Sequence, residues 1–459
     1  MPDQGIDAYA AYLPAYVLTD NRLDADGPPR TGGPSRGVAG FDEDVVTMAV
    51  EALRHLTAST GPLLLATTSA PYEAKTAAGI VHEALGLDPG VSAADLRGHR
   101  SGATALDLVL RAGALAAAAD VRTTRPGAPD ELGQGDAAAA FAGGGARAAV
   151  LLGRAGHTTE ILERWRLPGE RHDRVWDERF TAEILAAAGL DAARRALAEA
   201  SLDAVDHVVV ASSNPRAAAA LRKSLRGAGQ DAALERATGF TGAAHPGLLL
   251  AAALDDADPG QTILLLSATE GADAFVFRAG DGIREARTGP PVREQLAARQ
   301  HLGYGRYLRW RGPRRAGTGP PGGTAPAAPP MHRRAGWKYR LEGSQCGACG
   351  RITTPPSRVC AACGIAGAGE AKVSLRDRTA RVVSVTRDHL TTMPEPEVAV
   401  VIADVDGGGR LSVYATDIPP GDVTVGMPMT PTFRRLWTTD AIHNYFWKLR
   451  PRKDTTDGQ

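Results

Sequence analysis

Short apolar runs alternate with longer alanine-rich stretches from residue 1 to about residue 285. Four runs are dense enough in aliphatic residues to predict buried strands: LLLATT (63–68), RAAVLLG (147–153), HVVVASS (207–213) and QTILLLSA (261–268). Helical patterns lie between or beside them, over residues 73–85, 101–118, 177–200, 215–227 and 247–257. Short apolar strands separated by such helices predict a layered α/β fold with buried sheets.

Two segments suggest an internal duplication. GDAAAAF (135–141) and GADAFVF (271–277) each place Gly, Asp, small residues and Phe near the end of a strand–helix series. A repeated unit would fix the architecture. The alternative is chance similarity in a chain rich in Ala and Gly, and these residues alone leave both open.

The pattern changes after residue 312. Residues 312–335 are rich in Pro and Gly and predict a linker. Further on, β-branched runs at 380–390, 397–417 and 429–437, with a DGGG turn, predict a small antiparallel barrel, most simply an OB-fold. The aromatic segment 440–451 is predicted to pack as a C-terminal cap.

The four cysteines form the strongest motif. Cys346 and Cys349 form one CxxC knuckle, and Cys360 and Cys363 form a second one ten residues later. Two such turns can complete a tetrahedral shell of four thiolates, which is the arrangement of a zinc ribbon. A redox CxxC is the alternative, but two copies at this spacing favour zinc. Four thiolate ligands leave no open position, so we expect a structural Zn²⁺ ion.

Composition limits the function classes. Lys+Arg and Asp+Glu each number 52, so the formal net charge is zero, which disfavours nucleic-acid binding as the main role. No apolar stretch approaches the ~18 residues needed to span a bilayer, so no membrane partner is predicted. The N-terminus lacks the pattern of a signal peptide, and the clustered cysteines indicate a reducing compartment. We therefore predict a cytoplasmic protein.

Several stretches carry a resemblance to a known family. GFDEDVVTMAVEAL (40–53), ADLRGHRSGATAL (94–106), GQGDAAAAF (133–141) and TGFTGAAHPGLLL (238–250) resemble the hydroxymethylglutaryl-CoA synthase-like members of the thiolase superfamily, which includes ketoacyl synthase III. The cysteine-containing part resembles the zinc-ribbon and OB-fold domain that accompanies thiolase-like enzymes and is associated with acyl-CoA binding.

The resemblance implies an architecture and partners. The expected fold is a five-layer αβαβα sandwich of two similar halves over residues 1–285. A connecting segment (286–335), a zinc ribbon (336–370) and an OB-fold domain with its tail (371–459) would follow. The implied substrate is a coenzyme A thioester, presented as acyl-CoA or on an acyl-carrier protein, and the implied assembly is a homodimer.

The chain departs from the family at its nucleophile. The family's acylated cysteine corresponds to Arg100, and all four cysteines of this chain lie in the ribbon. The family's catalytic Glu falls at or near Thr68, its His at Ala211 or Ser212, and the Asn of its GN motif at Phe240. An acyl-cysteine mechanism is therefore not expected.

Three functions remain open. The first is aldol or retro-aldol chemistry on an acyl thioester, which needs a base and an oxyanion site but no nucleophile. The second is acyl transfer, either direct or through Ser101 or Ser212. The third is a non-catalytic companion that binds acyl-CoA beside a thiolase-like enzyme.

The candidate site residues follow from these alternatives. Each has a structural reading as well: a histidine held by packing, a capping side chain, or an Arg100 paired with Asp95 or Asp44. The predicted catalytic residues are His245, His99, Ser212, Asn214 and Tyr72. The predicted substrate-binding residues are Arg100, Ser101 and Thr241.

Overall fold

The computed structural model describes residues 4–22, 33–56, 61–225, 227–229, 232–312, 327–367, 371–391 and 393–452. The chain forms two compact units. The first contains most of the chain up to Arg311, so it extends past residue 285 through several short helices. The second runs from Gly312 onward and includes residues 41–43 and 83–86.

Five strands form the first sheet of the first unit. Their order is β2 (Ala8–Tyr12), β8 (Ala137–Ala142), β7 (Leu115–Asp120), β5 (Leu63–Thr67) and β6 (Ala93–Arg97). Strands β7, β5 and β6 are parallel, and β8 runs antiparallel to both β2 and β7. The predicted strand at 63–68 is confirmed.

The second sheet repeats this design. Its order is β1 (Gly5–Ile6), β9 (Ala149–His157), β15 (Ala272–Ala279), β14 (Thr262–Ala268), β12 (His207–Ser212) and β13 (Ala228–Gly229). From β9 onward, the strand directions match those of the first sheet. Strand β15 runs antiparallel to both β9 and β14, as β8 does to its neighbours, and β14, β12 and β13 are parallel to one another. The two echoing segments, 135–141 and 271–277, lead into the equivalent strands β8 and β15. The internal duplication is confirmed.

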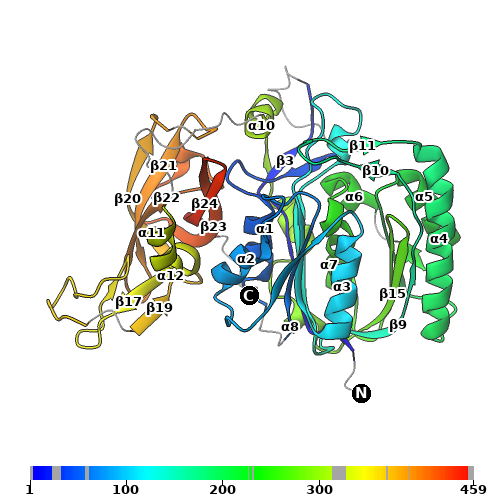
Figure 1. Ribbon diagram of the computed structural model, residues 1–459, viewed down its shortest axis with the longest axis horizontal. Helices are drawn as coiled ribbons and strands as arrows, with labels where there is room; N and C mark the ends of the chain where they lie inside the picture. The colour runs from blue at the N-terminus through cyan, green and yellow to red at the C-terminus, as the bar shows by residue number, and fades with distance from the viewer. Residues whose placement is uncertain are drawn as a thin grey trace. The chain divides into compact units, whose positions relative to one another are not determined.

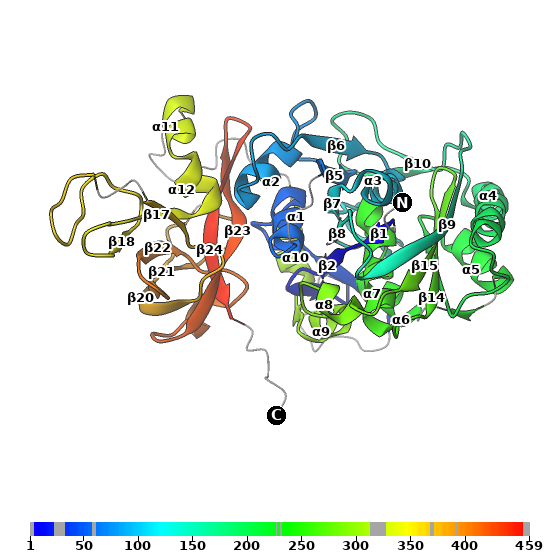
Figure 2. The same cartoon turned by 90° about the horizontal axis from the view of Figure 1, so that it is seen from below.

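Helices alternate with the two sheets. In Figures 1 and 2, α1 (Val45–Leu53) covers the outer face of the first sheet, and α4 (Glu178–Glu199) with α5 (Pro215–Ser224) covers that of the second. Helices α3 (Ser101–Ala112) and α7 (His245–Asp256) lie between the sheets. This is the predicted five-layer αβαβα sandwich.

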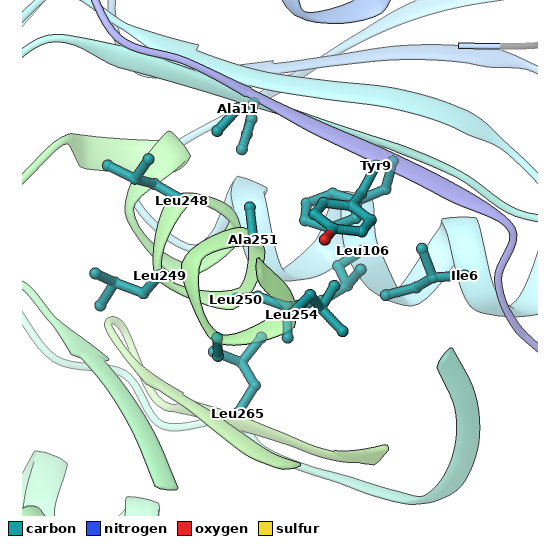
Figure 3. Packing of buried hydrophobic residues seen from close by; sticks show 14 of the residues in the cluster. Ile6, Tyr9, Ala11, Leu106, Leu248, Leu249, Leu250, Ala251, Leu254 and Leu265 are labelled. Atoms are coloured by element: carbon teal, nitrogen blue, oxygen red, sulfur yellow. The ribbon is translucent and has the colours of Figure 1, made fainter. Parts of the chain in front are cut away.

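The central layer carries the main core. Leu248, Leu249, Leu250 and Leu254 of α7 are fully buried, in one cluster with Tyr9 of the first sheet and Leu265 of the second (Figure 3). The start of α3 lies so close to the turn before α7 that a Cβ on Gly102 would be 1.8 Å from the carbonyl oxygen of Ala243. A glycine is therefore required where the two central helices meet.

Two predicted helices differ from the structure by at least five residues at one end. The alanine-rich segment 113–118 is not helical: Gly113 takes a left-handed conformation that ends α3, and LAAAAD enters the sheet as β7, fully buried. Burial between two neighbouring strands therefore overrides the helix propensity of alanine. Helix α2 (Ala78–Leu85) begins five residues later than predicted, where the Asp95 carboxylate accepts hydrogen bonds from the amides of Ala77 and Ala78.

Smaller elements complete the first unit. They are β3 (Tyr16–Leu18), β4 (Arg36–Val38), β10 (Arg164–Trp165), β11 (Arg174–Val175), α6 (Ala232–Thr238), α8 (Ile283–Ala286), α9 (Val292–Ala297), β16 (Gln300–His301), α10 (Tyr304–Arg311) and the 3₁₀ turns at Glu131–Gly133 and Gly242–Ala244.

The second unit is rich in β-structure. A ribbon sheet has the order β18 (Ile352–Thr353), β17 (Glu342–Gln345) and β19 (Ala371–Ser374). A second, antiparallel sheet has the order β22 (Arg410–Tyr414), β21 (Val398–Val405), β20 (Ala380–Asp388), β23 (Pro428–Thr439) and β24 (Ile442–Pro451). One bridge, Ala415 to Leu449, joins its two ends, and no continuous ladder closes a barrel within the described residues.

Two sequence predictions for this unit need correction. The terminal aromatic segment is strand β24, not a cap, because it pairs with β23 along its whole length. Part of the predicted linker forms helices α11 (Ala328–Arg333) and α12 (Ala335–Arg340), while residues 313–326 lie outside the described residues. In neither unit does a described helix have the length and apolar character to cross a membrane.

Candidate functional site

A cavity of about 990 Å³ opens at the carboxyl end of β12 in the first unit. Ser212 and Ser213, at the end of that strand, line it together with Phe240 and His245. Of the predicted catalytic residues, Ser212 and His245 line this cavity. The carboxyl ends of strands in α/β sheets are common binding sites, so the topology favours a functional role here.

His245 begins α7 and is almost fully buried. Its Nε2 lies 3.1 Å from Oε1 of Glu235, and its Nδ1 lies 3.4 Å from both the amide nitrogen and Oγ1 of Thr241. Burial alone would raise the pKa of Glu235, but the hydrogen bond from His245 and the charge of Arg222 hold that pKa below its usual range. The Glu235 carboxylate thus orients the imidazole, which leaves Nδ1 with only long contacts.

The serines at the end of β12 have different partners. The Ser212 hydroxyl donates to the carbonyl oxygen of Ala268 at 2.7 Å, while the Ser213 hydroxyl donates to Oε2 of Glu163 at 2.6 Å. Asn214 caps α5: its Oδ1 accepts two helix amides, and its Nδ2 donates to the carbonyl oxygen of Glu178 at 2.9 Å. Asn214 is therefore committed to local structure.

Asp173 gathers several cations at the cavity wall. Its carboxylate binds Arg122 and Arg166, the latter at 3.0 Å, and lies 4.0 Å from Arg164. Burial would raise the pKa of Asp173, but the charges of Arg122 and Arg166 hold it below its usual range. Asp173 is thus an ionised anchor for these arginines.

His99 lies beside this cluster, with Nε2 3.9 Å from Asp173 Oδ2. Burial, and then the positive charge of Arg122, lower the pKa of His99 to about 4. The imidazole is therefore neutral near pH 7. Its buried Nδ1 has no hydrogen-bond partner among the described residues.

Arg100 occupies the N-cap position of α3, where the resemblance places the nucleophile; its side chain makes no capping hydrogen bond and is held by an ion pair. Its Nε and Nη2 donate to the two carboxylate oxygens of Asp273 at 2.7 and 2.8 Å. The expected partners Asp95 and Asp44 instead bind helix amides. Next to it, the Ser101 hydroxyl donates to the carbonyl oxygen of Gly98 at 2.7 Å.

Asp120 occupies the end of the first sheet near Thr68. This fully buried carboxylate accepts five hydrogen bonds of 2.8 Å, from the hydroxyls of Thr67, Thr68 and Ser69 and the amides of Thr68 and Ala243. All three hydroxyls therefore donate their hydrogen bonds to the same carboxylate.

The remaining predicted residues lie apart. Tyr72 is partly exposed, its carbonyl oxygen accepts from Arg97 at 3.1 Å, and its ring faces Lys75. Thr241 is fully buried and supports the His245 ring. Sequence reasoning missed Glu163, Arg164, Asp173 and Glu235. The only visible signal was the position of Glu235 ten residues before His245.

The cysteine cluster forms a compact site in the second unit. Ligand atoms of Cys346, Cys349, Cys360 and Cys363 lie within 4.8 Å of one another, with the closest sulfur pairs at 3.6 and 3.7 Å. A tetrahedron of Zn–S bonds of about 2.3 Å has S···S edges of about 3.8 Å, so the four thiols fit zinc. Gly350 and Gly364 directly follow the two knuckles and have positive φ, a conformation that favours glycine.

Comparison with known proteins agrees with this architecture. The hydroxymethylglutaryl-CoA synthase of Archaeoglobus fulgidus is 31% identical over 344 residues, which cover 67% of this chain and 98% of that protein. The chain belongs to the hydroxymethylglutaryl-CoA synthase family. The Pyrococcus furiosus hydroxymethylglutaryl-CoA synthase is 29% identical, with 68% of this chain and 97% of that protein covered.

Solved structures of hydroxymethylglutaryl-CoA synthases share the fold. A crystal structure of HMG-CoA synthase complexed with CoA matches with a TM-score of 0.57 and 19% identity, covering 69% of this chain and 92% of that one. The 3-oxoacyl-[acyl-carrier-protein] synthase III of Aquifex aeolicus matches with a TM-score of 0.50 and 20% identity, over 60% of this chain and 99% of that one.

The second unit adds a domain to this member of the hydroxymethylglutaryl-CoA synthase family. Residues 335–367 match the family described as ChsH2, rubredoxin-like zinc ribbon domain. The match covers all four cysteines, so family and geometry agree on a zinc ribbon. Zinc would be held by Cys346, Cys349, Cys360 and Cys363, and it would stabilise the fold of the ribbon.

Proposed function

We propose that the first unit forms or cleaves a carbon–carbon bond on an acyl thioester, carried by coenzyme A or an acyl-carrier protein. Membership of the hydroxymethylglutaryl-CoA synthase family supports this reaction class. Structures with the same fold are described as complexes with CoA and with an acetyl donor acyl-carrier protein, which supports these two carriers.

One observation carries the proposal for this chain. The cavity at the end of β12 holds a histidine–carboxylate pair, while all four cysteines lie between residues 346 and 363. Aldol chemistry needs a proton acceptor for a hydroxyl and stabilisation of an enolate, whereas an acyl-enzyme needs a nucleophile. The histidine–carboxylate pair can supply the proton acceptor that aldol chemistry needs.

His245 is the proposed base for the substrate hydroxyl. Its Nε2 faces Glu235, so the carboxylate would stabilise the imidazolium that forms when Nδ1 takes a proton. The 3.4 Å contacts of Nδ1 with Thr241 are at the long limit for hydrogen bonds, so a substrate hydroxyl could replace them. In the cleavage direction, the proton moves from the β-hydroxyl to Nδ1 as the C–C bond breaks.

The test is conversion of a panel of acyl-CoA and β-hydroxyacyl-CoA thioesters, followed by mass spectrometry of the small molecules. The proposal predicts products that differ by a C–C bond, with turnover reduced roughly 10²-fold or more by His245→Ala. Binding of the thioester should change little in this variant. A wild-type protein that binds CoA but converts none of the panel would overturn the proposal.

A companion role is the second candidate, and a specific observation favours it. Arg100 stands where the resemblance expects the nucleophile, and its guanidinium is paired with Asp273. CoA binding without turnover would establish this function.

Acyl transfer through Ser101 or Ser212 is less favoured, because both hydroxyls donate to backbone carbonyls and neither has a base as its partner. Homodimerisation stays a prediction.

A further inference from the structure

The cavity is lined by five carboxylates that differ in their surroundings. Asp130 and Glu178 are exposed. Asp173 and Glu235 are bound by arginines, and the pKa of each is below its usual range. A carboxylate held by a guanidinium is a weak proton acceptor. The fifth carboxylate, Glu163, is neither exposed nor bound by an arginine.

Glu163 is only 3% exposed and lies just before β10. Its Oε2 accepts the hydrogen bond of 2.6 Å from Ser213, which is a neutral group. No cation forms an ion pair with it among the described residues. The negative charge of Glu163 acts on the Arg164 guanidinium through space, but the two form no ion pair. A buried carboxylate without such a direct partner is costly. Ser213 fixes one oxygen and leaves the other for a ligand.

Arg164, the next residue, also lines the cavity. Its side chain is 10% exposed, and its nearest acid is Asp173 at 4.0 Å, which Arg122 and Arg166 approach more closely. The buried Nε of Arg164 has no hydrogen-bond partner in the described structure. An unsatisfied buried donor in a cavity is a site where an anionic oxygen would be stabilised.

We propose that Glu163 forms the enolate of the bound thioester and that Arg164 stabilises it. Glu163 accepts the proton from the α-carbon, and the electron pair of the broken C–H bond moves into the thioester carbonyl, whose oxygen becomes negative. The Arg164 guanidinium stabilises that oxygen, and Ser213 positions the Glu163 carboxylate. In the reverse direction Glu163 returns the proton to carbon. This step deepens the proposed function and rests on it.

Exchange of α-hydrogens isolates this step from C–C chemistry. Acetyl-CoA and propionyl-CoA are incubated with the protein in D₂O, and mass spectrometry measures deuterium uptake. The wild type should exchange, and Glu163→Gln, which keeps the acceptor for Ser213, should exchange roughly 10²-fold more slowly or worse. Thioester affinity should stay within threefold. Ser213→Ala should lose roughly tenfold, and Glu163→Asp should retain more exchange than Glu163→Gln.

The matched control is Glu160→Gln, the same change at an exposed position three residues earlier. It should exchange within twofold of wild type. Exchange at the wild-type rate in Glu163→Gln overturns the assignment, and so does a wild type that exchanges neither thioester. If the wild type exchanges but converts none of the thioester panel, the proposed C–C reaction fails while the enolate assignment stands.

Arg164 is tested in the same assay. Arg164→Met removes the charge with similar side-chain bulk and should slow exchange roughly 10²-fold, the weight of one oxyanion donor. Arg164→Lys should recover part of the rate, because it restores the charge without the fork of donors. Equal exchange in wild type and Arg164→Met would exclude Arg164 from the step. A loss of affinity with an unchanged maximal rate would assign it to binding instead.

Discussion

The ends of β5 and β12 occupy equivalent places in the two sheets, yet their polar residues have different partners. At β5, the hydroxyls of Thr67 and Thr68 are consumed by buried Asp120. At β12, the Ser213 hydroxyl binds Glu163 at the wall of a cavity. Of these hydroxyls, only that of Ser213 belongs to a residue that lines the cavity, although residues between 122 and 134 of the first half also form part of its wall.

The two central helices show the same difference. The start of α3 is closed by the ion pair between Arg100 and Asp273, whereas the start of α7 places His245 in the cavity wall. We infer that the chemistry of this chain resides mainly in the residues of the second half and in the cavity wall at 163–173.

The largest expected effect lies outside both halves, in the ribbon. Cys349→Ser should abolish stoichiometric zinc, measured by elemental analysis as about one ion per chain in wild type. Ribbon folding should fail with it, because structural zinc supplies about 10 kcal/mol or more. The first unit should keep its own unfolding transition in calorimetry. Loss of that transition would show that the two halves depend on the ribbon.

Asp120→Ala tests the hydrogen-bond network at the end of β5. It removes a carboxylate that accepts five hydrogen bonds and leaves buried donors without partners. We expect a loss of about 4 kcal/mol or more in the free energy of unfolding, measured by urea denaturation. Asp255→Asn, at a partly buried acid of the same unit, is the comparison. A loss below about 1 kcal/mol for Asp120→Ala would contradict the claim that these hydrogen bonds stabilise the fold.

Acid should weaken the fold through His99. Its folded pKa of about 4 lies below its ordinary value of 6.5, so between these values the unfolded chain binds a proton that the folded chain does not. Stability should therefore fall as the pH drops below 6.5 and level off below 4, by about 3 kcal/mol. His99→Gln should remove this part of the pH dependence, and His207→Gln should not. An unchanged profile in His99→Gln would refute the assignment.

The smallest expected effect belongs to Arg100. Since its ion pair with Asp273 is partly exposed, Arg100→Gln should cost about 1–2 kcal/mol of stability. A double-mutant cycle with Asp273→Asn should show coupling of similar size. Turnover should change less than threefold. A loss of turnover beyond 10²-fold with stability intact would return the chemistry to the first half.

Local patterns predicted much of this molecule. The zinc ribbon followed from the spacing of its cysteines, because all four ligands lie within 18 residues. Buried strands followed from their apolar runs, and the five-layer sandwich from family resemblance. The boundary after Ala112 was missed, because sheet burial decides between helix and strand for an alanine run.

The candidate site was less predictable for a physical reason. Ser213 and Glu163 are 50 residues apart, and Arg100 and Asp273 are 173 residues apart, so neither pair leaves a spacing pattern in the chain. His245 could be selected because it follows the glycine-containing loop TGFTGAA and begins an apolar helix. Its partner Glu235 and the lone carboxylate of Glu163 become visible only when the fold brings the segments together.

The most direct test of the account compares two buried serines, Ser101 at the start of α3 in the first half and Ser213 after β12 in the second. Ser101→Ala and Ser213→Ala each remove one hydroxyl that donates a single short hydrogen bond. With a thioester that the wild type converts, Ser213→Ala should lower kcat roughly tenfold, equivalent to about 1.4 kcal/mol, and Ser101→Ala should stay within twofold. Intact-mass spectra should show no acyl adduct. A larger loss in Ser101→Ala, or an acyl group on Ser101, would contradict the claim that the second half carries the chemistry.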